Sequence, residues 1–339
     1  MPRKSRIDAP GAVHHIILRG IDRQDIFRDD TDRENFLERI GKHILKTNTG
    51  CFAWVLMSNH VHMLLKTGRA PIATIMRRVL TGYAVSFNRR HRRFGHLFQN
   101  RYKSFLCEEE LYLKELVRYI HLNPLRAGIV RDMGELSRYA WCGHGAILGL
   151  VDVDWQDTDY VLKFFGNRLK RARESYSVFT ANGVVQGKRA DLVGGGLIRS
   201  VGGWSEVKKC RDMGLRVQSD ERILGSSDFV ERVLRQADEQ LEEKYRLQSA
   251  NISIEALVEA VSEFFDITAE RLRSSSKNRT VTRARRVLCY LALRKIRYSG
   301  AHLSREIGIS PNTVSRAAEL GSKLADIDGI QKEILASIK

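Results

Sequence analysis

The amino-acid sequence predicts an α+β protein, in which a ferredoxin-like, split βαβ domain is followed by an all-α helix-turn-helix domain. Three observations predict this class. Residues from about 12 to 130 alternate between strand-like and helix-like apolar spacing. From about residue 251 onward the spacing is helical only. Residues 301–317 match the interior pattern of two helices joined by a tight turn.

The order of elements identifies the first domain, which we place at residues 1–150. Residues 12–18 are strand-like, and residues 31–45 are helical with acidic residues in the first turn. Residues 52–57 and 61–66 then form a hairpin-like pair of strands.

The second half of this domain continues the alternation. A long helix runs from Pro71 to beyond Phe87, residues 102–106 are strand-like, and a helix over 108–122 opens with three glutamates. The order strand-helix-strand-strand-helix-strand is typical of a split βαβ sheet, with its helices expected on one face.

Residues 151–250 are predicted to be a linker region of uncertain fold that is partly helical. The glycine-containing segments 191–196 and 201–203 predict turns, and a helix over 228–245 is expected with Ser227 as its cap.

Residues 251–339 are predicted to form a DNA-binding domain. Within its helix-turn-helix segment, Ser304 is the small residue where the helices cross and Gly308 makes the turn. The second helix of such a motif fits the major groove of duplex DNA. The predicted interior positions are Leu303, Ile307, Ile309, Val314 and Ala317.

The charge distribution favours a polyanionic partner. The chain has 57 Lys and Arg against 40 Asp and Glu, a formal net charge of +17. There is no acidic residue between Glu38 and Glu108, nor between Glu270 and Glu306, although both spans are rich in arginine. Two basic surfaces predict two contacts with nucleic acid. Solubilising surface charge remains the alternative.

The cysteines and the hydropathy pattern predict a cytoplasmic protein. The five cysteines are scattered without any Cys-x-x-Cys pair, which disfavours a zinc ribbon or a disulfide framework and fits a reducing compartment. No stretch approaches the roughly 20 apolar residues of a membrane span, so no membrane contact is expected.

The most informative motif is the triplet His60-Val61-His62 in a predicted strand. Residues two apart in a strand point to the same face, so the two imidazoles would lie together. With an oxygen ligand they would hold one divalent cation and leave positions open for a substrate. A lone His-x-His pair is otherwise more often part of a core.

Tyr119 and Asn123 strengthen the metal-site interpretation. They lie four residues apart in a predicted helix and therefore on one face. Asn123 offers an amide oxygen as a ligand, and Tyr119 offers a phenolic nucleophile. Tyr83 is the alternative nucleophile, but its helical spacing with neighbouring apolar residues favours a core position. The other histidines considered, for which a structural role is expected, are His14, His15, His43 and His96.

Residues 1–150 resemble the HUH single-tyrosine transposase family, specifically its REP-associated branch. The matching motifs are Ile17-Leu18-Arg19-Gly20, Asn59-His60-Val61-His62, Gly95-His96-Leu97-Phe98-Gln99-Asn100-Arg101-Tyr102 and Tyr119-Ile120-His121-Leu122-Asn123-Pro124.

This resemblance implies a ligand set and a reaction. His60 and His62 would bind Mg²⁺ or Mn²⁺, Asn123 would be the third ligand, and Tyr119 would be the nucleophile. The family commonly has glutamine as third ligand, so the amide at Asn123 is shorter. The implied activity is a metal-dependent transposase and endonuclease that cuts single-stranded or hairpin DNA through a 5′-phosphotyrosine. No nucleotide cofactor is implied, and a homodimer is left open.

Several side chains in the first basic span are expected to contact this DNA. Phe98 and Tyr102 are candidates for stacking on unpaired bases, with core packing as the equal alternative. The expected phosphate contacts are Arg77, Arg78, Arg89, Arg90, Arg92, Arg93 and Arg101.

The C-terminal domain resembles the DNA-binding domain of the bacterial replication initiator DnaA over about residues 254–320. The matching segments are 254–261, 271–274 and 284–291. The recognition helix departs from the initiator's Asp-His-Thr-Thr-Val pattern at 310–314, which implies a different target sequence. The side chains expected to read bases are Asn312, Thr313, Ser315 and Arg316, and the expected backbone contacts are Arg285, Arg286 and Lys295.

Two other functions are compatible with these residues. A nicking enzyme of rolling-circle replication or conjugation would share the chemistry, but the helicase or second tyrosine typical of that class is not visible. A catalytically silent DNA-binding regulator is the second alternative, which the presence of His60, His62, Tyr119 and Asn123 disfavours.

Overall fold

The computed structural model of the chain describes residues 7–8, 11–187, 189, 192, 220, 222–249, 252–274, 276, 278–296 and 298–338. The chain divides into two compact units, residues 1–234 and 235–339. Apart from Leu192, the predicted turns at 191–196 and 201–203 lie outside the described residues. Among the residues described, no helix is both long and apolar enough to cross a membrane.

The first unit is built on a five-stranded sheet with the order β2-β3-β1-β4-β5. Its first four strands give the order expected of a split βαβ sheet, and the predicted α+β class is confirmed. The neighbouring pairs β2–β3, β3–β1 and β1–β4 are antiparallel, whereas β4 and β5 are parallel. The strands are β1 (Val13–Arg19), β2 (Gly50–Leu56), β3 (His60–Lys66), β4 (Lys103–Cys107) and β5 (Ile223–Leu224).

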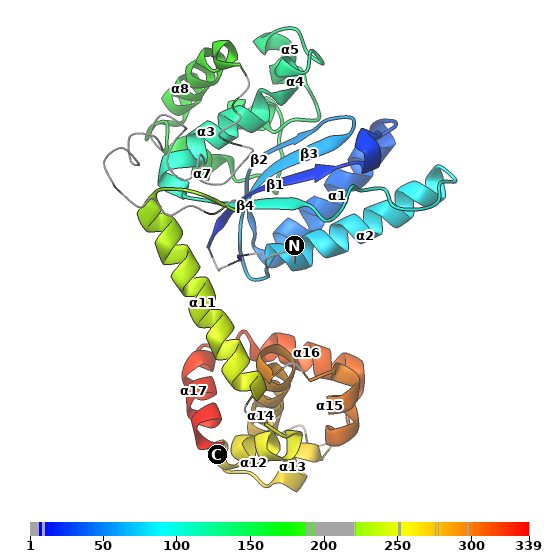
Figure 1. The fold of residues 1–339 in the computed structure, drawn as a ribbon, viewed down its shortest axis with the longest axis vertical. Helices are drawn as coiled ribbons and strands as arrows, with labels where there is room; N and C mark the ends of the chain where they lie inside the picture. Colours follow the sequence, from blue (N-terminus) through cyan, green and yellow to red (C-terminus); the bar gives the residue numbers. More distant parts are fainter. Residues whose placement is uncertain are drawn as a thin grey trace. The chain divides into compact units, whose positions relative to one another are not determined.

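Helices α1 (Asp30–Thr47) and α2 (Ile72–Arg90) cover one face of this sheet (Figure 1). The Asp29 side chain caps α1 by accepting a hydrogen bond from the Asp32 amide. Apolar residues of both helices pack on alternate strand residues such as Ile16 and Met63. This layer is the one that the element order predicts.

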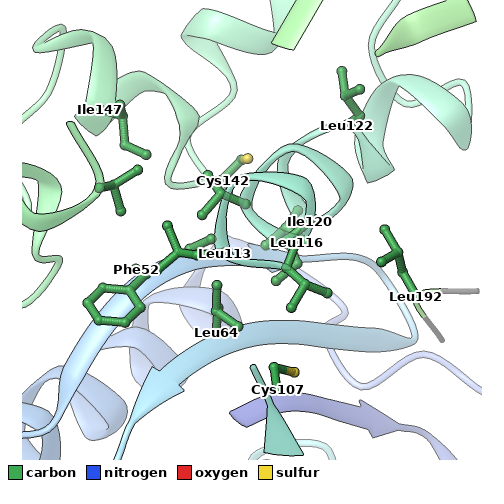
Figure 2. Close-up of a cluster of buried hydrophobic side chains, with 14 of the residues drawn as sticks. Phe52, Leu64, Cys107, Leu113, Leu116, Ile120, Leu122, Cys142, Ile147 and Leu192 are labelled. Atoms are coloured by element: carbon green, nitrogen blue, oxygen red, sulfur yellow. The ribbon is translucent and has the colours of Figure 1, made fainter. Parts of the chain in front are cut away.

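Helix α3 (Glu109–His121) covers the opposite face, which corrects the expectation that the helices lie on one face only (Figure 1). Figure 2 shows its apolar side chains, including Leu113 and Leu116, above the strands that carry Phe52 and Leu64. Both faces of the sheet are therefore buried, because a third helix follows the split βαβ order.

The end of α3 explains the proline in the motif at residues 119–124. Helix α3 ends at His121, and the four-residue helix α4 (Asn123–Arg126) begins immediately afterwards. Pro124 lies in the first turn of α4, where its missing N–H has no intrahelical partner to lose. The chain can therefore turn directly after α3, within a few residues of Tyr119.

Residues beyond 150 complete the core around α3. Val161 of α7 (Thr158–Lys163) and Ala172 and Tyr176 of α8 (Leu169–Asn182) are buried in the same apolar cluster as Leu116. Strand β5 also belongs to this sheet, although no fifth strand was predicted. Two short helices, α5 (Met133–Arg138) and α6 (His144–Leu148), lie between α4 and α7 in the chain.

The second unit is helical and has its own core. Helix α11 (Ser227–Ser249) begins in the first unit, and its first turn is capped by the Ser226 hydroxyl rather than by Ser227. The remaining α-helices are α12 (Ile254–Phe264), α13 (Ala269–Arg273), α14 (Arg279–Tyr290), α15 (Gly300–Ile307), α16 (Pro311–Gly321) and α17 (Ile327–Ser337), and a π-helical turn spans Leu291–Ile296.

Helices α15 and α16 form the predicted helix-turn-helix. Gly308 adopts a left-handed backbone with φ of 67°, as the turn requires. Leu303, Ile307 and Val314 are buried as expected, but Ala318 is buried in α16 whereas Ala317 is only partly so. Ile309 is partly buried as well.

Candidate functional site

The topology brings the end of α3 to the histidines of β3. Strand β4 runs antiparallel to β1, and α3 then reverses direction across the face of the sheet, beginning where Glu109 pairs with Lys66 at the far end of β3. Its last turn therefore reaches the opposite end of β3, where His60 lies beside Arg19 of β1. The sheet and α3 together place Tyr119 at the His60–His62 end.

Tyr119 and the predicted histidines meet on the face of the sheet that α3 covers. The ring centroids of His62 and Tyr119 are 5.8 Å apart, with the rings at 79° to one another. The rings of His60 and His62 are 5.2 Å apart. His15 of β1 completes the group, with its ring 6.0 Å from that of Tyr119.

Both histidines of the triplet use Nδ1 for a bond within the protein. His60 Nδ1 lies 2.7 Å from Asn59 Oδ1, and His62 Nδ1 lies 3.0 Å from His15 Nε2. Asn59 Oδ1 is an acceptor, so His60 carries its proton on Nδ1 and has a lone pair on Nε2. If His62 donates to His15 in the same way, its Nε2 also has a lone pair to offer.

The surroundings of both histidines favour the neutral imidazole. Burial lowers the pKa of His60 to about 4, and the positive charge of Arg19 adds to this shift. Burial lowers the pKa of His62 well below its usual value, and His15, His60 and Arg19 add to the effect. Neutral imidazole is the form that binds a divalent cation, so this donor set fits a metal ion.

Asn123 lies just after α3, and the amide nitrogen of its side chain already makes hydrogen bonds there. Its side-chain Nδ2 donates to the Tyr119 carbonyl at 2.9 Å and to the Ile120 carbonyl at 3.2 Å. These bonds satisfy carbonyls that the end of a helix leaves without partners. The amide oxygen is the part of this side chain that could act as a ligand.

Two residues of the site were not assigned by the sequence. His15 was given a structural role, yet it bonds His62 and faces Tyr119. Arg126 places its guanidinium 5.4 Å from the centre of the Tyr119 ring, and its Nη1 donates to the Tyr119 carbonyl. The role of His15 could have been predicted from the pairing of β1 with β3 that the split βαβ order implies. The position of Arg126 beside Tyr119 could not, because it depends on how the chain turns at Pro124.

The arginines predicted to contact DNA fall into two groups. Arg90 and Arg93 are held within the protein, because Arg90 pairs with Asp29 and Asp32 and Arg93 donates to the His96 carbonyl. Arg90 is nonetheless exposed, and so are Arg77, Arg78, Arg89, Arg92 and Arg101.

A second cluster of metal-ligand type lies on α1 and α2, on the other face of the sheet. It contains Asp29, Asp32 and His91. The guanidinium of Arg90 bonds both carboxylates at 2.6–2.7 Å and lowers the pKa of Asp29 to about 2. A cation is therefore already paired with these acids, and the cluster is far from Tyr119 in the topology.

The other aromatic candidates of this unit belong to the core. Tyr83 is almost fully buried and its hydroxyl donates to the Ile26 carbonyl, which confirms its assignment to the core. Tyr102 is buried in the same cluster, and Phe98 is partly buried with its ring near that of Tyr83.

In the second unit, the side chains expected to read bases are exposed on α16. They are Asn312, Thr313, Ser315 and Arg316. Arg286 and Lys295 are partly buried. Arg285 is occupied, since its guanidinium donates to the carbonyls of Leu272, Ser274 and Ser276 and so holds the segment after α13.

Comparisons with known proteins agree with both resemblances. Residues 10–123 match the family model of the IS200-like transposases, and residues 254–319 match that of the helix-turn-helix of bacterial DnaA. A solved structure of a REP-associated tyrosine transposase bound to a REP hairpin is similar at 15% identity and a TM-score of 0.38. It covers 46% of this chain and 98% of its own. No curated protein matches the chain.

The predicted resemblances are therefore confirmed for these residues: residues 10–123 are similar to the IS200-like transposases, and residues 254–319 are similar to the helix-turn-helix of bacterial DnaA.

Proposed function

We propose that the protein is a metal-dependent, transposase-like endonuclease and strand transferase that cuts single-stranded DNA through a 5′-phosphotyrosine on Tyr119. The observation that carries this proposal is the convergence of Tyr119 with His60 and His62 at one end of the sheet. The match of residues 10–123 to the IS200-like transposases supports it.

The reaction is a transesterification. The Tyr119 hydroxyl oxygen attacks the scissile phosphorus and the bond from phosphorus to O3′ breaks. The phenolic proton passes to solvent and the departing oxygen takes up a proton, which leaves a 5′-phosphotyrosine and a free 3′-hydroxyl. Strand transfer is the reverse step, in which a 3′-hydroxyl attacks the ester and Tyr119 regains its proton. The ester conserves the bond energy, so no nucleotide cofactor is required.

His60 and His62 would hold Mg²⁺ or Mn²⁺ through Nε2, with the Asn123 amide oxygen as the third ligand. When bound, such an ion would polarise the scissile phosphate and offset the charge that builds on its oxygens. In this proposal Asn59 and His15 hold the two imidazoles in the orientation that binding needs. Arg126 holds the Tyr119 backbone and ring in place.

The second unit would bind duplex DNA through α16. Its exposed polar side chains at 312–316 suit the edges of bases in the major groove. The acid-free span around it supplies cations for phosphates. The DnaA-type match of residues 254–319 supports this division of labour, in which one unit cuts a single strand while the other locates a duplex.

A denaturing gel with end-labelled single strands and Mn²⁺ tests the proposal. The wild-type protein should retain the label of the strand that lies 3′ of the cut, as a covalent adduct. Tyr119→Phe should still bind DNA and form no adduct, and EDTA should abolish the adduct of the wild-type protein.

His60→Ala and His62→Ala are the companion variants, and each should abolish cleavage. Tyr83→Phe is the matched control and should still form the adduct, because that hydroxyl lies in the core. Adduct formation by Tyr119→Phe, or undiminished cleavage in EDTA, would refute the mechanism.

A further inference from the structure

The loop between α2 and β4 exposes an aromatic side chain at the end of the sheet where His60 lies. Phe94 is 93% exposed, and it is the one aromatic residue among the large apolar side chains found exposed in the described parts of the chain. Backbone bonds tie the base of this loop to the end of β1, from the Gln99 amide to the Arg19 carbonyl and from the Ile21 amide to the Leu97 carbonyl. Arg19 is paired in register with His60.

The loop is a fixed structure that presents Phe94 outwards. The Asn88 side chain spans its neck, since Nδ2 donates to the Gly95 carbonyl and Oδ1 accepts from the Arg93 guanidinium. Arg93 also donates to the His96 carbonyl at 2.8 Å. Gly95 has a φ of +85°, a conformation that glycine adopts without strain. The backbone on either side of Phe94 is therefore held by hydrogen bonds within the loop.

The side chains around Phe94 are suited to nucleic acid. Arg92, two residues before it, and Arg89, in the last turn of α2, are exposed, and the acid-free span of the sequence includes the whole loop. An exposed apolar ring among cations suits a base, which offers a flat π surface, on a backbone that carries phosphates. Phe98 and Tyr102, the aromatic candidates from the sequence, pack against the core instead.

We propose that Phe94 is a stacking platform for an unpaired base of the DNA strand that reaches Tyr119. This inference rests on the proposed function, because it assigns part of the path of that substrate. The arginines beside the ring hold the flanking phosphates, and the stacked base fixes the position of the strand along the end of the sheet. Stacking is tolerant of base identity, so the contact adds affinity for single strands without reading their sequence.

Binding of a fluorescent oligothymidine to the full-length Tyr119→Phe protein, which cannot cleave, tests this role. The matched probe is the same strand with abasic sites in place of the thymines. Phe94→Ala should weaken binding of oligothymidine about tenfold and leave binding of the abasic strand unchanged. Phe94→Trp should restore the difference between the two strands. Val85→Ala, which removes another exposed apolar side chain from α2, is the control and should have no effect.

A strand containing 2-aminopurine gives an independent measurement. Its fluorescence should be quenched by the protein with Phe94 or Phe94→Trp and not by Phe94→Ala. Equal binding of oligothymidine by Phe94→Ala, or an equal loss for both strands, would overturn the proposal. A change in self-association on sedimentation, with DNA binding intact, would instead identify the ring as a contact with a second copy.

The measurement is independent of catalysis. If the wild-type protein forms no covalent adduct but Phe94 still discriminates oligothymidine from the abasic strand, the cleavage mechanism fails and the stacking contact stands. If the adduct forms and Phe94→Ala binds normally, only the stacking contact fails.

Discussion

At the scale of single residues, the site depends on how each imidazole is held. His60 and His62 share a face because they are two apart in β3, and this was predictable from the sequence. The hydrogen-bond partners of these two histidines were harder to predict. Asn59 belongs to the same motif, but His15 reaches His62 only because β1 lies beside β3.

His15→Leu removes the partner of His62 Nδ1. We expect Mn²⁺ affinity to fall by about 10- to 100-fold, because partners of metal-ligating histidines fix the ring orientation. Electron paramagnetic resonance of free Mn²⁺ would measure it. His14→Leu is the control, since His14 is equally buried but bonds Ser104 on the other face. Unchanged affinity in His15→Leu would show that His62 is oriented by other means.

Asn123 has two separable parts. Asn123→Asp keeps an oxygen ligand but loses the donor to the carbonyls of Tyr119 and Ile120. We expect retained Mn²⁺ binding together with a loss of about 1–2 kcal/mol in unfolding free energy, as for a lost buried hydrogen bond. Asn123→Leu should lose Mn²⁺ affinity as well as stability. If Mn²⁺ binds Asn123→Leu as tightly as the wild type, the third ligand lies elsewhere.

At the scale of elements, the position of α3 decides which residues meet at the site, and only part of that position could be predicted from the sequence. Its bounds and its amphipathic pattern follow from the sequence, and so does the common face of Tyr119 and Asn123. The choice between the two faces of the sheet does not follow from the sequence, because β1 and β2 are buried along nearly their whole length and show no alternation of apolar and polar residues. That choice puts Tyr119 on the same side as His62 rather than on the side of α1 and α2.

The contact between α14 and α16 depends on Gly321. A Cβ at this position would lie 2.2 Å from the Arg286 carbonyl oxygen, which is backbone and has little freedom to move. Gly321→Ala should therefore destabilise the second unit by about 1–3 kcal/mol. Thermal unfolding followed by circular dichroism would show it. Gly300→Ala in α15 is the control, since its Cβ would enter open space, and an equal loss there would refute the packing argument.

At the scale of the whole molecule, the chain combines two units with different DNA forms as proposed targets. The helix-turn-helix was predictable because its interior spacing and its glycine turn are local features. The contribution of residues 151–234 to the first unit could not be predicted from the sequence. Tyr176 and Val161 stand out in no way in the sequence, and only the folded unit shows that they complete the core around α3.

Fragments test this organisation. Residues 1–234 should fold and cleave single strands, whereas residues 1–150 should be unstable because α7 and α8 no longer cover the core. Residues 235–339 should bind duplex DNA without cutting it. Their affinity should fall steeply with salt, as expected for phosphate contacts. A fragment 235–339 without duplex affinity would contradict the function proposed for α16.

The most direct test of the central claim is the identity of the residue that carries the DNA. The adduct formed with a single-stranded substrate and Mn²⁺ would be digested with nuclease and protease, and the nucleotide-bearing peptide sequenced by mass spectrometry. We predict a nucleotide attached through its 5′-phosphate to Tyr119, beside His62 and His15. Attachment at Tyr83, Tyr112 or any other residue, or an adduct through a 3′-phosphate, would contradict this account.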